Sequence, residues 1–223
     1  LLVDLDPQAN GTSGAGIPKD FGGPSIYEVL IGKARARDAI QKTALQALSV
    51  LPSRPDLIGA EVELVGMSGR ESLLKHALAD VASEYDFILL DCPPSLGLMT
   101  LNGLTAAHSV LIPIQCEYYA LEGLGRLLET IRLVRMGLNP DLAIEGGLLT
   151  MYDGRLTLAR QVVENVQRNF PGRVFSTIIP RSIRLSEAPS FGQPILLYDI
   201  RSAGAEAYLS LAEEVINGPA PGA

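Results

Sequence analysis

The chain has 223 residues, 47% of them hydrophobic, and can therefore bury the core of one large α/β domain. No apolar run approaches the roughly 18 residues of a membrane span, and Cys92 and Cys116 form no CxxC pair, so we expect a soluble, cytoplasmic protein in a reducing compartment. A formal net charge of −7 argues against a protein that coats nucleic acid with its whole surface, so any DNA contact must be local.

Apolar runs of strand length recur along the chain, and segments with helical spacing lie between them. The predicted strands cover residues 1–5, 48–51, 87–90, 110–114, 148–151 and 174–179. The clearest helical segments carry Leu124, Leu127, Leu128 and Ile131, and then Val162, Val163, Val166 and Phe170. The strands are continuously apolar and alternate with helices, which predicts an α/β fold with a doubly wound, mainly parallel sheet flanked by helices.

Two further stretches, residues 11–24 and 52–69, are predicted to be surface connections. We expect a single domain over residues 1–217 and a disordered tail over residues 218–223, where Gly, Pro and Ala form no regular element. The chain opens on an apolar run that starts at Leu1 with no polar lead-in. This opening predicts that the sequence begins inside a strand.

The first acidic candidates end the first apolar run. In open parallel sheets ligands bind beyond the carboxyl ends of the strands, so polar residues there are candidates for chemistry. Asp4 and Asp6 are two positions apart on an extended strand and are predicted to project to the same side, where paired carboxylates can hold a hydrated Mg²⁺ or orient a water. The alternative is that Asp6 merely starts a turn before Pro7.

A third acid, Asp91, follows the apolar run 87–90. An acid in this position is typical of the strand that supplies a Mg²⁺-linked aspartate in P-loop NTPases, although acids at strand ends are common. Pro93 and Pro94 give the strand a rigid, extended exit and prevent a helix from starting at once.

Four blocks together carry a family resemblance. They are VDLDPQAN, DFILLDCPPSLGLMTLNGL, PIQCEYYALEGL and IIPRSIRLSEAPSFGQPI, and in this order they closely resemble the ParA/Soj family of deviant-Walker partitioning ATPases over nearly the whole chain. The resemblance implies a P-loop NTPase fold of the ParA/MinD type. It also implies ATP and Mg²⁺ as cofactors and ATP hydrolysis as the activity.

The resemblance assigns roles to individual residues. Asp6 corresponds to the acid that orients the attacking water, Asp4 to its companion that reaches the metal through water, and Asp91 to the Walker B acid. Pro93 is counted with the nucleotide-binding residues. In the family, the segment that matches Pro180 and Arg181 lies against the adenine.

Two more residues are expected near the same base. Met151 and Tyr152 end another predicted strand, and we expect them to line the adenine pocket. For Tyr152 the alternative is an ordinary half-buried aromatic residue.

The resemblance also implies partners. Proteins of this family dimerise around ATP, bind double-stranded DNA of the nucleoid without sequence preference, and are stimulated to hydrolyse ATP by a ParB/Spo0J-type protein. Residues 154–201 hold seven arginines against three acids, which suits phosphate contacts. Arg184 and Arg201 are the candidates for DNA contact, and solvated or ion-paired arginines are the alternative. Residues 117–123 are expected to relay the nucleotide state to the dimer face, or else to form a loop with locally packed tyrosines.

The sequence departs from the family at one point, because no KGGxGK[ST]-like loop occurs in it. We therefore expect a chain truncated by its first strand and phosphate loop, and inactive as written. The alternative function is a nucleotide-independent DNA-binding or partner-binding protein, or a nonfunctional relic. A membrane-bound MinD-like protein is disfavoured because no basic amphipathic helix follows Ile216, and Cys92 and Cys116 are expected to be small core residues rather than cluster ligands.

Overall fold

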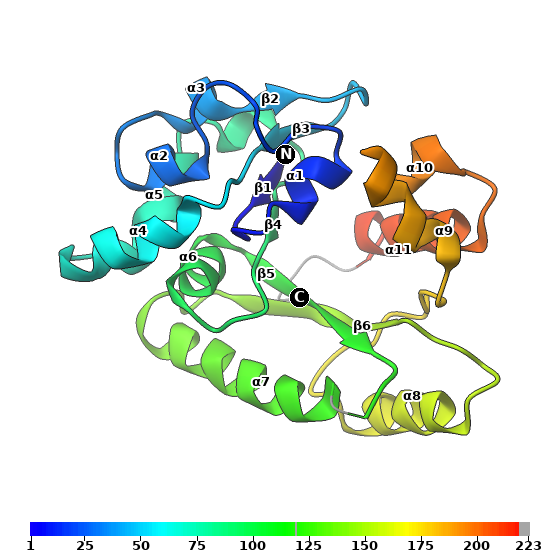
Figure 1. The fold of residues 1–223 in the computed structure, drawn as a ribbon. Coiled ribbons are helices and arrows are strands. Elements are labelled where there is room, and N and C mark those ends of the chain that lie inside the picture. The colour runs from blue at the N-terminus through cyan, green and yellow to red at the C-terminus, as the bar shows by residue number, and fades with distance from the viewer. Residues whose placement is uncertain (119, 219–223) are drawn as a thin grey trace. The chain divides into compact units, whose positions relative to one another are not determined.

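The computed structural model describes residues 1–118 and 120–218, and Figure 1 shows their fold. The chain divides into two compact units. The first unit consists of Leu1–Ala107 with Pro189–Pro194, and the second of His108–Ala188 with the described part of Ile195–Ala223. The single domain over residues 1–217 stays a prediction. All of the expected tail except Gly218 lies outside the described residues.

The first unit is built on a four-stranded sheet in the order β2, β3, β1, β4. These strands are β2 (Gln41–Lys42), β3 (Ser49–Leu51), β1 (Leu2–Asp4) and β4 (Leu89–Asp91). The central strand β1 is parallel to β3 and β4, and the short edge strand β2 is antiparallel to β3. In the pairing of β1 with β4, Asp4 stands opposite Asp91.

Short helices surround this sheet. They are α1 (Asn10–Gly14), α2 (Ile26–Leu30), α3 (Ala36–Ala39), α4 (Leu57–Glu63), α5 (Leu73–Leu78) and α6 (Leu98–Ala106), with 3₁₀ turns at Leu64–Gly66, Arg70–Ser72 and Ala82–Glu84. The core of this unit contains the fully buried aliphatic side chains of Val3 in β1, Leu5 directly after β1 and Leu51 in β3. Each such side chain stabilises the fold by about 1.5–3 kcal/mol relative to an exposed position.

The prediction of surface connections at residues 11–24 and 52–69 is wrong in part, because most of α1 falls in the first stretch and all of α4 in the second. Leu57, Ala60 and Leu64 recur at i, i+3 and i+7 and are fully buried. This spacing places them on one helix face, which packs into the core of the first unit. The glycines and prolines around α4 conceal that pattern.

The second unit contains a parallel pair of strands, β5 (Ser109–Gln115) and β6 (Ala143–Thr150). Its helices are α7 (Ala120–Gly137), α8 (Thr157–Asn169), α9 (Ile183–Glu187), α10 (Ile195–Tyr198) and α11 (Ala203–Ile216), and a further 3₁₀ turn spans Ala188–Phe191. Within this unit, α7 and α8 lie on one side of the strand pair and α11 lies on the other (Figure 1). The mainly parallel α/β fold flanked by helices is confirmed.

The strand predicted over residues 174–179 does not form. Isolated parallel bridges join the segment to its neighbours, from Gly147 to Val174 and from Tyr152 to Pro180, and the N–H groups of Phe175 and Ile179 donate to β6. Between these two residues the carboxylate of Glu214 of α11 accepts the backbone N–H groups of Ser176 at 3.0 Å and of Thr177 at 2.6 Å. These two N–H groups therefore bond to Glu214 and not to β6, so the ladder is interrupted.

No helix among the described residues is long and apolar enough to cross a membrane.

Candidate functional site

Asp4 lies at the centre of the site in the first unit, at the carboxyl end of β1. Its side chain is fully buried. One carboxylate oxygen, Oδ1, accepts the N–H of Asp6 at 3.0 Å. The other, Oδ2, accepts both the N–H and the hydroxyl of Thr12, each at 2.7 Å. The chain's own donors therefore use both carboxylate oxygens of Asp4.

Asp91 stands beside Asp4 on the neighbouring parallel strand. Its carboxylate has no hydrogen-bond partner or ion-pair partner within residues 1–118 and 120–218, and the residue is exposed. Although the residue as a whole is exposed, its carboxyl group is partly withdrawn from water, and this burial together with the charges of Asp4 and Asp6 raises its pKa to about 6. Asp91 thus carries a carboxylate that gains from a cation placed next to it.

Gly11, in the first turn of α1, passes close to both of these carboxylates. A Cβ at this position would lie 2.8 Å from Oδ2 of Asp91 and 3.2 Å from Oδ2 of Asp4. A side chain at this position would displace the carboxylate of Asp91 and crowd that of Asp4, so glycine favours this close approach of the helix to the acids.

Asp6 follows β1 and is half-buried. Its Oδ1 accepts the N–H of Gln8 at 2.9 Å, and its backbone carbonyl accepts the N–H of Ala9 at 2.9 Å. The turn that the alternative interpretation proposes is therefore present, while a role for Asp6 in chemistry stays a prediction. We call Asp4, Asp6 and Asp91 the acid cluster.

Two further predictions concern the exit of β4. The strand ends at Asp91, and half-buried Pro93 follows without a helix until α6 begins at Leu98.

The two cysteines are free thiols packed against the protein interior. The thiol of Cys92 packs so closely on Gly103 of α6 that a Cβ at Gly103 would lie 2.6 Å from its Sγ, and burial raises the pKa of Cys92 to about 12. Cys116 is buried and also free. Both cysteines are core thiols.

The second unit brings Met151 and Tyr152 together with Pro180 and Arg181. The N–H of Arg181 donates to the carbonyl of Tyr152 at 2.9 Å. Met151 has a φ of 54°, a left-handed conformation that turns the chain directly after β6. Tyr152 is half-buried, as the alternative interpretation expects. The guanidinium of Arg181 pairs with Glu117 at 2.6 Å, a partner that the sequence did not indicate.

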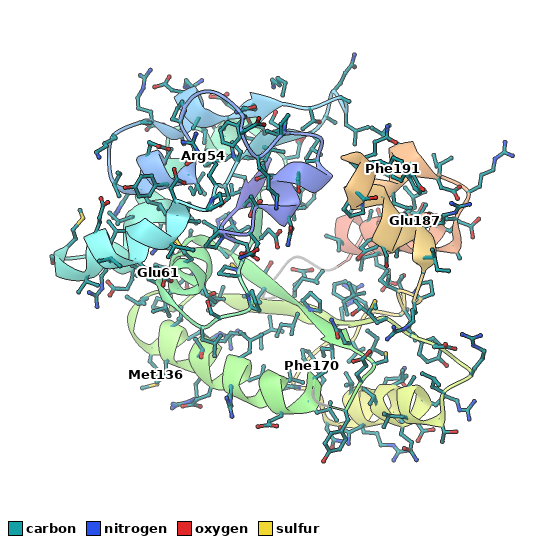
Figure 2. All side chains as sticks on the ribbon, viewed as in Figure 1. Arg54, Glu61, Met136, Phe170, Glu187 and Phe191 are labelled. Atoms are coloured by element: carbon teal, nitrogen blue, oxygen red, sulfur yellow. The ribbon has the colours of Figure 1, made fainter. Side chains whose placement is uncertain are left out.

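The arginines of residues 154–201 are mostly paired. The pairs are Arg155 with Asp153, Arg168 with Glu164, Arg173 with Glu214, Arg181 with Glu117, and Arg184 with both Glu187 and Asp199. Arg184 lies 3.0 Å from Glu187, which Figure 2 labels. Arg201 is exposed and has no ion pair within the described chain. The ion-pair interpretation therefore holds for five of the seven arginines, Arg184 among them.

Sequence reasoning missed Gly11, Thr12 and Ser53. The hydroxyl of Thr12 accepts the N–H of Ser53 at 2.9 Å, and both residues are fully buried. The sequence feature that could have indicated Thr12 is a hydroxyl residue within a Gly-rich segment that follows two acids. Nowhere in the described residues do three or more His, Cys, Asp or Glu side chains form a group that could hold a metal ion.

Comparisons with known proteins give a consistent family. Residues 1–144 match the model of the AAA domain family. The chromosome partitioning protein ParA of Myxococcus xanthus is 56% identical over 221 residues, which cover 99% of this chain and 78% of the relative. The sporulation initiation inhibitor protein Soj of Bacillus subtilis is 56% identical over 215 residues, which cover 96% of this chain and 85% of the relative.

Solved structures agree on the fold. Cobyrinic acid a,c-diamide synthase from Mycobacterium smegmatis, with bound ATP analog and magnesium, is 40% identical with a TM-score of 0.83, over 96% of this chain and 80% of that one. The cell division ATPase MinD of Pyrococcus furiosus is 27% identical with a TM-score of 0.77, over 96% of this chain and 84% of that one. The fold is that of P-loop NTPases, and the chain belongs to the ParA/Soj family of chromosome-partitioning proteins.

Proposed function

We propose that the protein is an ATP-switched partitioning ATPase in which the acid cluster serves phosphoryl transfer. The observation that carries this proposal is the pairing of Asp4 with Asp91 at the carboxyl ends of adjacent parallel strands. Ligands of open α/β sheets bind beyond this edge. Catalysis of phosphoryl transfer depends mainly on positioning and charge stabilisation, which the carboxylates of the acid cluster can provide together with a metal ion.

The acid cluster suits Mg²⁺ that contacts Asp91 directly and Asp4 through water. Asp91 has an uncommitted, partly buried carboxylate beside two other acids, which suits a hard cation with oxygen ligands. Mg²⁺ in nucleotide sites typically uses one or two carboxylates with phosphate and water ligands, so a complete protein cage is not required. When bound, the ion would neutralise charge on the phosphates. Asp4 would act on it only through water, because its oxygens are engaged within the chain.

Asp6 is proposed to orient the attacking water. It is half-buried, and the turn through Gln8 uses one of its carboxylate oxygens. The test is Asp6→Ala in the protein as the cell makes it, with Asp20→Ala, an exposed acid of the same unit, as the matched control. We expect Asp6→Ala to lose partner-stimulated hydrolysis and Asp20→Ala to retain it. Stimulated hydrolysis by Asp6→Ala at the wild-type rate would refute the assignment.

Recognition of the base is proposed for the segment formed by Met151, Tyr152, Pro180 and Arg181. The backbone bond between Arg181 and Tyr152 and the bridge to Pro180 support a preformed surface within the second unit. Binding of a fluorescent adenine nucleotide to Tyr152→Ala tests this role. We expect weaker binding at unchanged secondary structure, and unchanged affinity would contradict it.

We further propose an ATP-dependent homodimer that binds nucleoid DNA without sequence preference and responds to a ParB/Spo0J-type partner. Arg201 supports the DNA contact best, since Arg184 would first have to leave Glu187 and Asp199. DNA binding measured with and without ATP tests the switch. Equal binding in both conditions would instead favour a nucleotide-independent binding protein.

Hydrolysis itself is proposed to need a phosphate-binding loop as well as the acid cluster. The 223 residues contain no Gly-rich loop of the KGGxGK[ST] kind. A polypeptide of these residues alone should therefore hydrolyse ATP poorly or not at all. Comparing its ATPase rate with that of the protein from the cell tests the point, and equal rates would contradict it.

A further inference from the structure

We propose that the hydroxyl of Thr12 is a positioning group for the acid cluster and locks the loop after β3 to the end of β1. The inference rests on the proposed ATPase function and adds a residue to it. It concerns a side chain that touches Asp4 rather than the nucleotide. Thr12 is therefore a positioning residue and not a catalytic one.

The hydroxyl of Thr12 serves as donor and acceptor at the same time. It donates to Oδ2 of Asp4 at 2.7 Å and accepts the N–H of Ser53 at 2.9 Å. The backbone N–H of Thr12 adds a second bond to the same carboxylate oxygen at 2.7 Å. Among side chains of this size, only threonine and serine can make both hydroxyl contacts, and an isosteric valine can make neither.

Burial makes these bonds consequential. Asp4, Thr12 and Ser53 are all fully buried, so water cannot replace a lost partner. The other oxygen of Asp4 holds the N–H of Asp6. Loss of the Thr12 hydroxyl should therefore let the carboxylate of Asp4 move. This movement would shift the backbone of Asp6, the residue proposed to orient water.

The network continues beyond Ser53. The next residue, Arg54, which Figure 2 labels, donates to both carboxylate oxygens of Glu28 at 3.1 and 3.2 Å. Glu28 in turn accepts the N–H and the hydroxyl of Ser25, each at 2.7 Å, at the start of α2. Hydrogen bonds, together with the adjacent positions of Ser53 and Arg54 in the chain, thus connect the acid cluster, the exit of β3 and the start of α2 within the first unit.

The test compares three variants of the protein as the cell makes it. Thr12→Val removes both hydroxyl contacts at nearly constant volume, and Thr12→Ser keeps them. Thr105→Val is the matched control, because Thr105 is equally buried in the first unit but its hydroxyl donates only to Leu101 within α6. The measurements are kcat of stimulated hydrolysis and the Kd for a non-hydrolysable ATP analogue, at a temperature where all variants are folded.

We expect kcat of Thr12→Val to fall about tenfold or more, since a charged buried hydrogen bond is lost, while its Kd for the nucleotide stays within about twofold. Thr12→Ser should restore the rate, and Thr105→Val should match wild type. A wild-type kcat for Thr12→Val, with Asp6→Ala still inactive, would overturn this inference and leave the proposed function standing. Absence of hydrolysis in the wild type would instead refute the proposed function.

A measurement on the unmodified protein covers the case in which Thr12→Val does not fold. In hydrogen exchange, the amides of Thr12 and Ser53 should be protected to a similar degree, because each donates into the same buried network. Exchange of the Ser53 amide at the rate of an open loop would overturn the proposed network.

Discussion

Asp4 of the first unit and Arg184 of the second unit differ in the burial of their charges and in the partners that bind them. Asp4 is fully buried and fixed by three hydrogen bonds from the chain itself. Arg184 is 55% exposed in its side chain and pairs with two acids in water. Buried, satisfied charges fix geometry and are costly to remove, whereas exposed pairs contribute little to stability and remain available to a ligand. Stability should therefore depend on Asp4, and DNA affinity on exposed arginines such as Arg201.

The largest effect is expected for Asp4→Ala. The change leaves the N–H groups of Asp6 and Thr12 buried without an acceptor and should lower the free energy of unfolding by about 3 kcal/mol. Urea unfolding followed by circular dichroism measures it, with Asp20→Ala as an exposed control. Equal stability of Asp4→Ala and Asp20→Ala would contradict the claim that the buried hydrogen bonds of Asp4 stabilise the first unit.

Gly11→Ala should have the next largest effect. Its Cβ would displace the carboxylate of Asp91 and crowd that of Asp4, which three hydrogen bonds hold in place, so we expect a cost of about 2 kcal/mol. Gly22→Ala is the control, because nothing lies within 4 Å of a Cβ at that glycine. Thermal unfolding of both variants tests the close approach, and an unchanged Tm for Gly11→Ala would show that α1 does not pack on the acids.

A smaller effect, dependent on pH, is expected at Glu28. Burial opposes ionisation of this carboxyl, but the hydrogen bonds from Ser25 and the charge of Arg54 hold its pKa below the ordinary value of 4.5. The stabilisation is therefore complete above pH 4.5 and is lost as the pH falls through the lower pKa of the folded state.

Glu28→Gln should accordingly be less stable than wild type by about 1 kcal/mol near neutral pH, and the difference should shrink in acid. Urea unfolding across the pH range provides the measurement. A difference that grows on acidification would contradict the assigned hydrogen bonds.

The smallest effect on stability is expected in the second unit, where Arg201→Ala should change the unfolding free energy by less than about 0.5 kcal/mol. The same variant should bind DNA more weakly and lower the slope of log affinity against log salt by about one unit. Arg168→Ala, which removes an exposed arginine paired with Glu164, serves as the control. An unchanged salt slope for Arg201→Ala would exclude the phosphate contact.

Sequence patterns predicted the features that depend on local hydrophobicity. The continuous apolar runs at residues 1–5 and 87–90 predicted strands where β1 and β4 lie, and the spacing of Leu124 to Ile131 predicted a helix where α7 lies. The parallel pairing of β1 with β4 then brings the two acids together. The four sequence blocks identified the family.

Features that depend on distant partners were not predictable. The apolar pattern of residues 174–179 predicts a strand, yet the carboxylate of Glu214, far along the chain, accepts two of their backbone N–H groups. The structural use of Asp4 depends on Thr12 and Ser53, which no short motif connects. The ion pair of Arg181 with Glu117 joins residues 64 positions apart.

The most direct test of the central claim is the Mg²⁺-dependent hydrolysis of ATP by Asp91→Asn in the protein as the cell makes it, measured together with its stability. Asn removes a charge that is disfavoured by partial burial and by repulsion from Asp4 and Asp6, so the variant should be more stable than wild type at neutral pH. It should also lose hydrolysis, because the carboxylate proposed to face the metal is gone. Gain of stability with loss of activity would support a site built for a cation, whereas hydrolysis at the wild-type rate with unchanged Mg²⁺ dependence would contradict it.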